Sequence, residues 1–298
     1  MSSFHSPVAA PGAFPRRETY ERVAIGAIIA LLLIFLPAKY FLLAFIVFGQ
    51  GHFVMTYLYQ GKAGKVGWRY LTLYVVALGI LLYLVTFVID LSLLLFITGS
   101  VFALHFFYDE ARLYARDNGI TLALVWHPAL LFLLVLVEHL YAVDTLPIAI
   151  AATLLWVLQA ARRQGSNDAH RATGWYMALF STILLVALAA PITVPATSLL
   201  GAIILYHYLS WYVHYFFRLK DGTRPIRPYL ANIAYVNIVI IAGFAGYLLA
   251  AGPAREALGL LFDERYFYMW TLLHIFFASN EFLAAVRTQV LARIWRPA

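Results

Sequence analysis

Residues 67–89 read GWRYLTLYVVALGILLYLVTFVI and contain a single charged residue, Arg69, close to their start. A helix needs about 20 consecutive apolar residues to cross the hydrocarbon core of a bilayer. The 23 residues of this stretch meet that requirement. The stretch therefore predicts a transmembrane helix.

Nine further stretches of the chain have the same apolar character. With the first, the ten predicted spans are 22–37, 39–60, 67–89, 91–113, 120–141, 146–163, 172–190, 195–217, 229–251 and 264–288. Helices satisfy every backbone hydrogen bond inside lipid, so we expect an all-α, polytopic membrane bundle of about ten transmembrane helices. We expect residues 1–19 to be a disordered cytoplasmic tail and residues 20–298 to be one transmembrane domain.

The overall composition supports a membrane protein. Of the 298 residues, 63% are hydrophobic and 12% are charged, and the mean hydropathy is +0.82. A soluble chain has about 25% charged and 45–50% apolar residues. This composition excludes a soluble globular enzyme, a disordered protein and a nucleic-acid-binding domain. The chain has no cysteine, which excludes disulfides, thiolate-bound metals and iron–sulfur clusters.

The distribution of basic residues predicts the orientation in the membrane. With both termini in the cytoplasm and ten alternating spans, the cytoplasmic side holds 18 of the 21 lysines and arginines, and only Lys39, Arg255 and Arg265 lie on the other side. Cytoplasmic loops of membrane proteins are enriched in basic residues. This placement accounts for the net charge of +7 without any nucleic-acid partner.

Histidines are the residues that most clearly suggest a functional site. Seven of the nine lie within predicted spans: His52, His105, His127, His139, His207, His214 and His274. Ionisable residues inside a membrane are rare, and they usually face the interior of the bundle. Counted from the cytoplasmic end of each span, His52, His105 and His127 lie about 7–8 residues deep. His207 lies about 10 residues deep. The four therefore share a level to within about 5 Å.

We predict that His52, His105, His207 and His274 converge on one metal ion. His214 shares a helix face with His207, two turns away, and is a further candidate ligand. His127 is expected to complete or support the same centre. A single intramembrane histidine is often only a hydrogen-bonding strut between helices, but that interpretation weakens for so many of them.

Two carboxylates are candidates for holding metal-bound histidines in place. Asp109 follows His105 by one helical turn and shares its face, whereas Glu110 is expected to point away. Glu281 follows His274 by two turns. A carboxylate often accepts the second ring N–H of a ligating histidine. The alternative is that Asp109 and Glu281 extend to water at the cytoplasmic end of the bundle.

The metal-ligand chemistry favours iron. Imidazoles bind iron, copper and zinc well, so a histidine-rich site without thiolates favours Fe(II), with Cu or Zn as alternatives. Open coordination positions would bind O2, and an apolar substrate would enter from the bilayer. Tyr206 and Tyr208 lie deep enough to act in catalysis, either by holding a metal-bound oxygen or by lining a substrate channel. The alternative for the many aromatic residues is a belt at the membrane interface.

The histidine-bearing segments resemble those of the Brp/Blh-type membrane carotene dioxygenases of bacteria and archaea. The segments are GQGHFVMTYLYQ (49–60), LHFFYDE (104–110), VWHPAL (125–130), LYHYLSWYVHYFF (205–217) and LLHIFFASNE (272–281). The resemblance implies one non-haem iron held by histidines from several helices, cleavage of β-carotene to retinal with O2, and a place in the cytoplasmic membrane. It assigns these roles to His52, His105, His127, His207 and His274.

Two other classes of function stay open on the sequence alone. The chain could bind haem or a pigment without catalysis, or be an accessory subunit of a membrane complex. A pigment binder would place its histidines in both leaflets, whereas these lie mainly in the cytoplasmic half. The second class is a metal- or proton-coupled transporter, which inverted repeats and broken helices would favour.

Overall fold

The computed structural model describes residues 16–35, 37–62, 64, 66–115, 122–162, 168–189, 196–221 and 225–278. In this part of the chain all regular structure is helical, which confirms the all-α prediction. The helices are α1 (Arg16–Phe35), α2 (Ala38–Lys62), α3 (Trp68–Phe87), α4 (Leu91–Ala115), α5 (Leu122–Tyr141), α6 (Leu146–Arg162), α7 (Asp168–Ala189), α8 (Ala196–Asp221), α9 (Ile226–Leu249), α10 (Gly252–Phe262) and α11 (Glu264–Ala278).

The described boundaries of the predicted spans lie within four residues of the prediction, except at the start of the first span. Helix α1 begins at Arg16, so residues 16–19 are helical and not part of a disordered tail. These residues and the next turn include arginine and glutamate, which are good helix formers. Helix α11 coincides with the predicted span 264–288 as far as Ala278, and the rest of that span lies outside the described residues.

Helix α10 is an element that the sequence did not predict. It begins at Gly252, whose φ of +56° marks a sharp turn, and it has a proline in its first turn. Its 11 residues are too few to cross a bilayer. Its last carbonyl groups accept hydrogen bonds from Gln50 Nε2 and Trp270 Nε1, at 2.6 and 2.7 Å. These bonds connect the end of α10 to α2 and α11.

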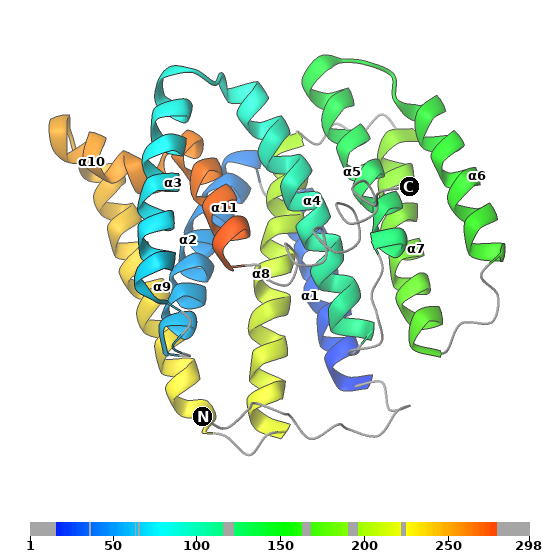
Figure 1. Ribbon diagram of the computed structural model, residues 1–298, viewed down its shortest axis with the longest axis horizontal. Coiled ribbons are helices and arrows are strands. Elements are labelled where there is room, and N and C mark those ends of the chain that lie inside the picture. The colour runs from blue at the N-terminus through cyan, green and yellow to red at the C-terminus, as the bar shows by residue number, and fades with distance from the viewer. Residues whose placement is uncertain are drawn as a thin grey trace.

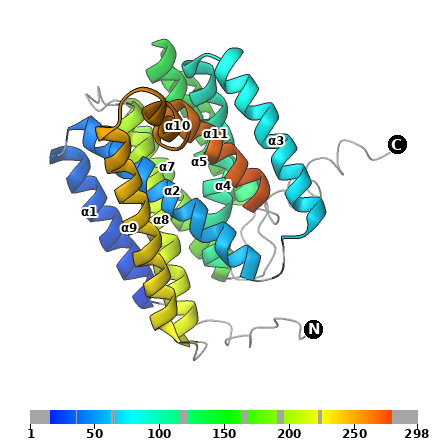
Figure 2. The same ribbon diagram turned by 90° about the vertical axis from the view of Figure 1, so that its left-hand side faces the viewer.

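The long helices run up and down along a common direction. In Figure 1 the α3–α4 and α5–α6 connections lie at the top, and the last turns of α2 and α8 lie at the bottom. Helix α4 packs on α5, α7 and α11, and α2 packs on α8, α9 and α11. Figure 2 shows the side of the bundle that α1 and α9 cover, with α10 at one end. The interior between α2, α4, α8 and α11 is therefore enclosed.

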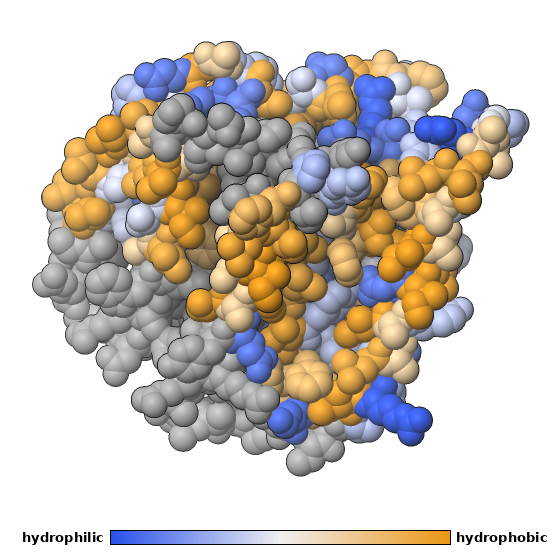
Figure 3. All heavy atoms as spheres, turned by 180° about the vertical axis from the view of Figure 1, so that it is seen from behind, coloured by the Kyte–Doolittle hydropathy of each residue, from blue (hydrophilic) through white to orange (hydrophobic). Residues whose placement is uncertain are grey.

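The exterior of the bundle is largely apolar. Among the described residues, three helical segments are long and apolar enough to cross a membrane. They are Trp68–Phe87, Leu91–Ala111 and Ile226–Leu249. Only 6% of the first segment and 11% of the third are buried within the protein, against 56% of the second. Figure 3 shows orange, apolar residues over the middle of the molecule and most of the blue, hydrophilic ones near its upper and lower edges. Apolar surface on this scale indicates a membrane protein.

Glycines allow α2 to approach its neighbours closely. A Cβ atom on Gly49 would lie 2.6 Å from the Phe267 ring and 3.0 Å from the Tyr208 hydroxyl, and one on Gly51 would lie 2.6 Å from the Asn237 side chain. Only glycine leaves room for these contacts. They bring the next turn of α2, which carries His52, into the interior between α8 and α11.

Candidate metal centre

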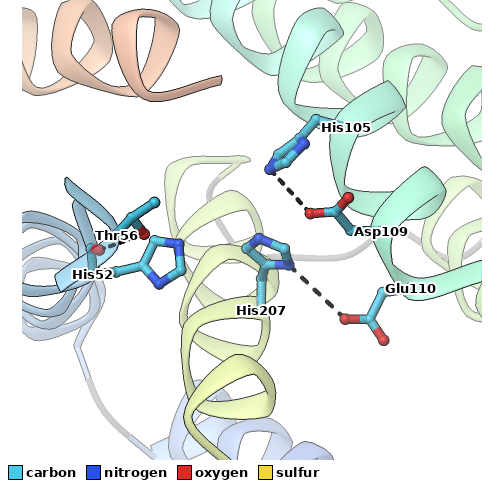
Figure 4. A network of polar contacts seen from close by, with 6 residues as sticks. All are labelled: His52, Thr56, His105, Asp109, Glu110 and His207. Atoms are coloured by element: carbon cyan, nitrogen blue, oxygen red, sulfur yellow. Dashed lines mark hydrogen bonds and ion pairs between the residues drawn. The ribbon is translucent and has the colours of Figure 1, made fainter. Parts of the chain in front are cut away.

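Four helices each contribute one buried histidine to the same region of the interior. His52 comes from α2, His105 from α4, His207 from α8 and His274 from α11, and each is at most 8% exposed. Figure 4 shows the first three, with His207 between the α2 and α4 side chains. Because the chain alternates in direction, residues at similar depth in distant parts of the sequence meet at one level.

Each of the four imidazole rings lies beside two of the others. Ring centres are separated by 4.9 Å between His52 and His274 and by 5.8 Å between His52 and His207. His105 lies 5.4 Å from His207 and 6.3 Å from His274. Each ring therefore has two histidine neighbours in a closed cluster, which we call the histidine cluster.

A carboxylate of α4 joins this cluster. Asp109 Oδ2 lies 3.5 Å from His105 Nε2, one helical turn along α4. One ligand atom from each of His105, Asp109 and His207 lies within 4.8 Å of the others, and all three residues are buried. This group could hold a metal ion. Asp109 thus lies beside the nitrogen ligand atoms themselves. The sequence suggested instead that it accepts a hydrogen bond from His105 on the side of the ring away from the ion.

The spacing of the four rings is compatible with a shared metal ion and is also that of rings packed without one. Ligand atoms close enough for one ion are those of His105, Asp109 and His207. Two imidazoles bound to one ion through bonds of about 2.0–2.1 Å have ring centres about 4.5–6.5 Å apart. The lower value applies when the two bonds meet at a right angle, and the upper one when they point in opposite directions. The four separations in the histidine cluster, from 4.9 to 6.3 Å, lie in this range. The donors are imidazole nitrogens and a carboxylate oxygen, a set that suits iron, copper or zinc.

The surroundings of the histidine cluster are mostly apolar. A small internal gap is lined by Phe53, Phe102, His105, His207, Tyr208, Thr271, His274 and Ile275, and it is too narrow for a water molecule. The Tyr208 ring stacks on His52 at 4.6 Å. Among the described residues, the buried Tyr208 hydroxyl and His274 Nδ1 have no hydrogen-bond partner. Buried polar atoms are costly when unpaired, which favours a ligand at this position.

Glu110 is a residue of the site that the sequence reasoning missed. It was expected to point away, but its Oε1 lies 3.9 Å from His207 Nδ1, and the residue is completely buried. Successive helical residues are about 100° apart, so Glu110 leaves the His105 face and reaches α8 instead. The sequence feature that could have indicated this role is the pair of adjacent acidic residues within an apolar helix.

Two other predicted site residues have contacts with residues outside the histidine cluster. His127 hydrogen-bonds Ser181 and Thr153 through its two ring nitrogens, at 2.9 and 3.0 Å, and stacks on Trp156. Both nitrogens are thus engaged between α5, α6 and α7, so His127 does not support the histidine cluster. His214 has ring contacts with Trp211 and Tyr215.

Tyr206 differs from Tyr208 in its surroundings. Its ring lies 6.4 Å from Phe106 and 6.1 Å from Phe180, and it reaches toward Gly26 of α1. Of the two predicted catalytic tyrosines, the structure brings only Tyr208 to the lining of the gap. Glu281, the second predicted carboxylate, lies outside the described residues.

Comparison with models of known protein families gives no match, and comparisons with curated proteins and with solved structures give none either. The resemblance to membrane carotene dioxygenases therefore stays a prediction.

Proposed function

We propose that this chain is an integral membrane, non-haem iron oxygenase that oxidises an apolar substrate with O2, and that this substrate is a carotenoid or a similar polyene. The observation that carries the proposal is the buried group of His105, Asp109 and His207, with the His52 and His274 rings against it. A bound Fe(II) ion would supply the redox chemistry that activates O2. Cu or Zn fits the same donors.

The side chains of the site would bind the ion and protect the reaction. His105 and Asp109 present two ligand atoms from one face of α4, and His207 presents a third from α8. Phe53, Phe102 and Ile275 line the gap beside them and exclude water. Exclusion of water prevents side reactions of reactive oxygen species. The Tyr208 hydroxyl is buried and without a partner among the described residues, so it can donate a hydrogen bond to a small molecule once the lining side chains move apart to admit it.

The proposed membrane arrangement has ten spans, α1 to α9 and α11, with both termini in the cytoplasm. Helix α10 would lie at the outer interface, and α11 would continue the last span. The basic residues favour this orientation. An apolar substrate would then reach the bundle interior from the lipid, and the membrane would be the cytoplasmic membrane of a bacterium or archaeon.

Metal analysis of the purified protein, together with its optical spectrum and an activity assay, tests the proposed function. We expect one iron per chain, no haem or pigment absorption, and O2-dependent conversion of β-carotene to aldehyde products in detergent micelles. A strong haem or pigment band would instead support the non-catalytic pigment binder. Metal that is bound and moved across proteoliposome membranes, without oxidation of any polyene, would support the transporter.

A further inference from the structure

We propose that Glu110 is a positioning residue that fixes the His207 ring for metal binding. This inference rests on the proposed function, because it assigns a role toward the same metal ion. Its starting point is a charged residue with no exposed surface near the C-terminal end of α4, the helix that contains the most buried of the three long apolar segments. Burial of a carboxylate in such a place is costly unless the charge is compensated.

The geometry connects Glu110 to only one side of the His207 ring. Glu110 Oε1 lies 3.9 Å from His207 Nδ1, within ion-pair reach. In Figure 4 this nitrogen of His207 points to Glu110, and the other faces the side where His52 and His105 lie. At 3.9 Å these two atoms are not hydrogen-bonded to each other, so we infer that a small shift on metal binding lets Nδ1–H donate to Glu110 and leaves the Nε2 lone pair for the ion. A carboxylate behind a ligating histidine fixes the tautomer and the ring orientation in this way.

The charge balance supports the same role. A divalent ion bound by neutral imidazoles and the Asp109 carboxylate leaves one net positive charge in the interior. The ionised Glu110 carboxylate, facing the opposite side of His207, adds one negative charge close to it. In a medium of low dielectric constant a charge with an opposite charge close to it is far less costly than an isolated charge. Asp109 would thus bind the ion directly, and Glu110 would act through His207.

Co(II) binding to the purified full-length protein in detergent tests this inference, because Co(II) reports its coordination through its visible spectrum. We expect Glu110→Gln to bind Co(II) about 10–100-fold more weakly than the wild type and with an altered spectrum, since loss of an outer carboxylate has effects of that size. Glu138→Gln is the matched control. Glu138 lies on α5 and accepts a hydrogen bond from Thr145, so this variant should match the wild type.

The possible results separate the two proposals. Glu110→Gln with wild-type affinity and spectrum would overturn the positioning role and leave the proposed function intact. Complete loss of Co(II) binding in this variant, as expected for His207→Ala, would make Glu110 a direct ligand and also overturn it. A wild-type protein that binds no Co(II), Fe(II) or other divalent metal would contradict the proposed function itself. If Glu110→Gln does not fold, Glu110→Asp keeps the charge but shortens its reach. Weaker Co(II) binding by that variant is then expected, and unchanged binding would overturn the role.

Discussion

Asp109 and Glu110 are neighbours in the sequence, yet they face two different histidines. Asp109 lies 3.5 Å from His105 on its own helix, and Glu110 lies 3.9 Å from His207 on α8. The difference follows from the rotation of about 100° per helical residue. One turn of α4 therefore supplies a histidine and two carboxylates to the centre, which makes α4 the main source of its polar groups.

The first prediction concerns the metal ligands. His105→Ala and His207→Ala should each abolish iron binding, because each removes one of three clustered ligand atoms. Asp109→Asn removes the charge of the third ligand, so we expect metal binding to be lost in this variant as well. Membrane insertion should be intact, since loss of a polar ring makes a helix more apolar. Metal content of membrane-extracted, monodisperse protein is the measurement.

His214→Ala provides the matched control, because His214 is on the same helix as His207 but contacts Trp211 and Tyr215. Its metal content should equal that of the wild type. Equal, mild losses of thermal stability in all four variants, with unchanged metal content, would show that the histidine cluster is only structural.

Substitution of His127 should lower thermal stability and leave metal binding unchanged, the opposite of what we expect for the cluster histidines. His127→Ala removes two hydrogen bonds and leaves Ser181 and Thr153 without this partner in the interior. Loss of buried partners costs about 1–3 kcal/mol. We expect a lower thermal unfolding temperature in detergent and wild-type iron content. Loss of iron with unchanged unfolding would return His127 to the metal centre, as the sequence had suggested.

At the scale of helices, the position of α2 depends on Gly49. Gly49→Ala would place a Cβ atom 2.6 Å from the Phe267 ring and 3.0 Å from the Tyr208 hydroxyl. Overpacking of this kind costs about 1–3 kcal/mol. We therefore expect reduced thermal stability and weaker iron binding, because α2 must move away from α8 and α11 and take His52 with it.

Gly79→Ala is the control for that variant. Gly79 lies in α3, and a Cβ atom added there meets nothing within 4 Å among the described residues. Its unfolding temperature should be unchanged or slightly raised, since alanine is the better helix former. If both variants unfold like the wild type, close packing at Gly49 does not position α2.

Most of the helices could be predicted from the sequence because long apolar runs separated by polar turns specify them. Depth along each span also indicated that His52, His105 and His207 lie at one level. Depth does not give the angle around the bundle axis, however, which is why His127, at a similar depth, was placed in the wrong group. The same limitation applied to Glu110, whose direction was judged only against its own helix. Helix α10 was missed because it is too short to register as a span.

At the scale of the whole molecule, the protein presents apolar residues outward and collects polar ones inside. Helices α3 and α9 are apolar and have few buried residues, whereas about half of α4, which carries His105, Asp109 and Glu110, is buried. This arrangement suits a protein surrounded by lipid, because the polar groups are shielded from the hydrocarbon.

The proposed orientation can be tested by labelling, since the chain contains no cysteine. Val66 lies between α2 and α3, and Val143 lies between α5 and α6, and both are exposed. In intact cells a membrane-impermeant thiol reagent should label Val143→Cys and not Val66→Cys. Both should react after the membrane is permeabilised. Labelling of Val66→Cys from outside would reverse the orientation.

The central claim is that histidines of four helices hold one metal ion in the interior. X-ray absorption spectroscopy at the iron edge of the iron-loaded protein tests it most directly. The predicted spectrum has nitrogen and oxygen neighbours at about 2.0–2.2 Å and the outer-shell scattering of several imidazole rings. That scattering should be lost with the iron itself in His105→Ala and His207→Ala. Iron without imidazole scattering, or a protein that retains no metal, would contradict the claim.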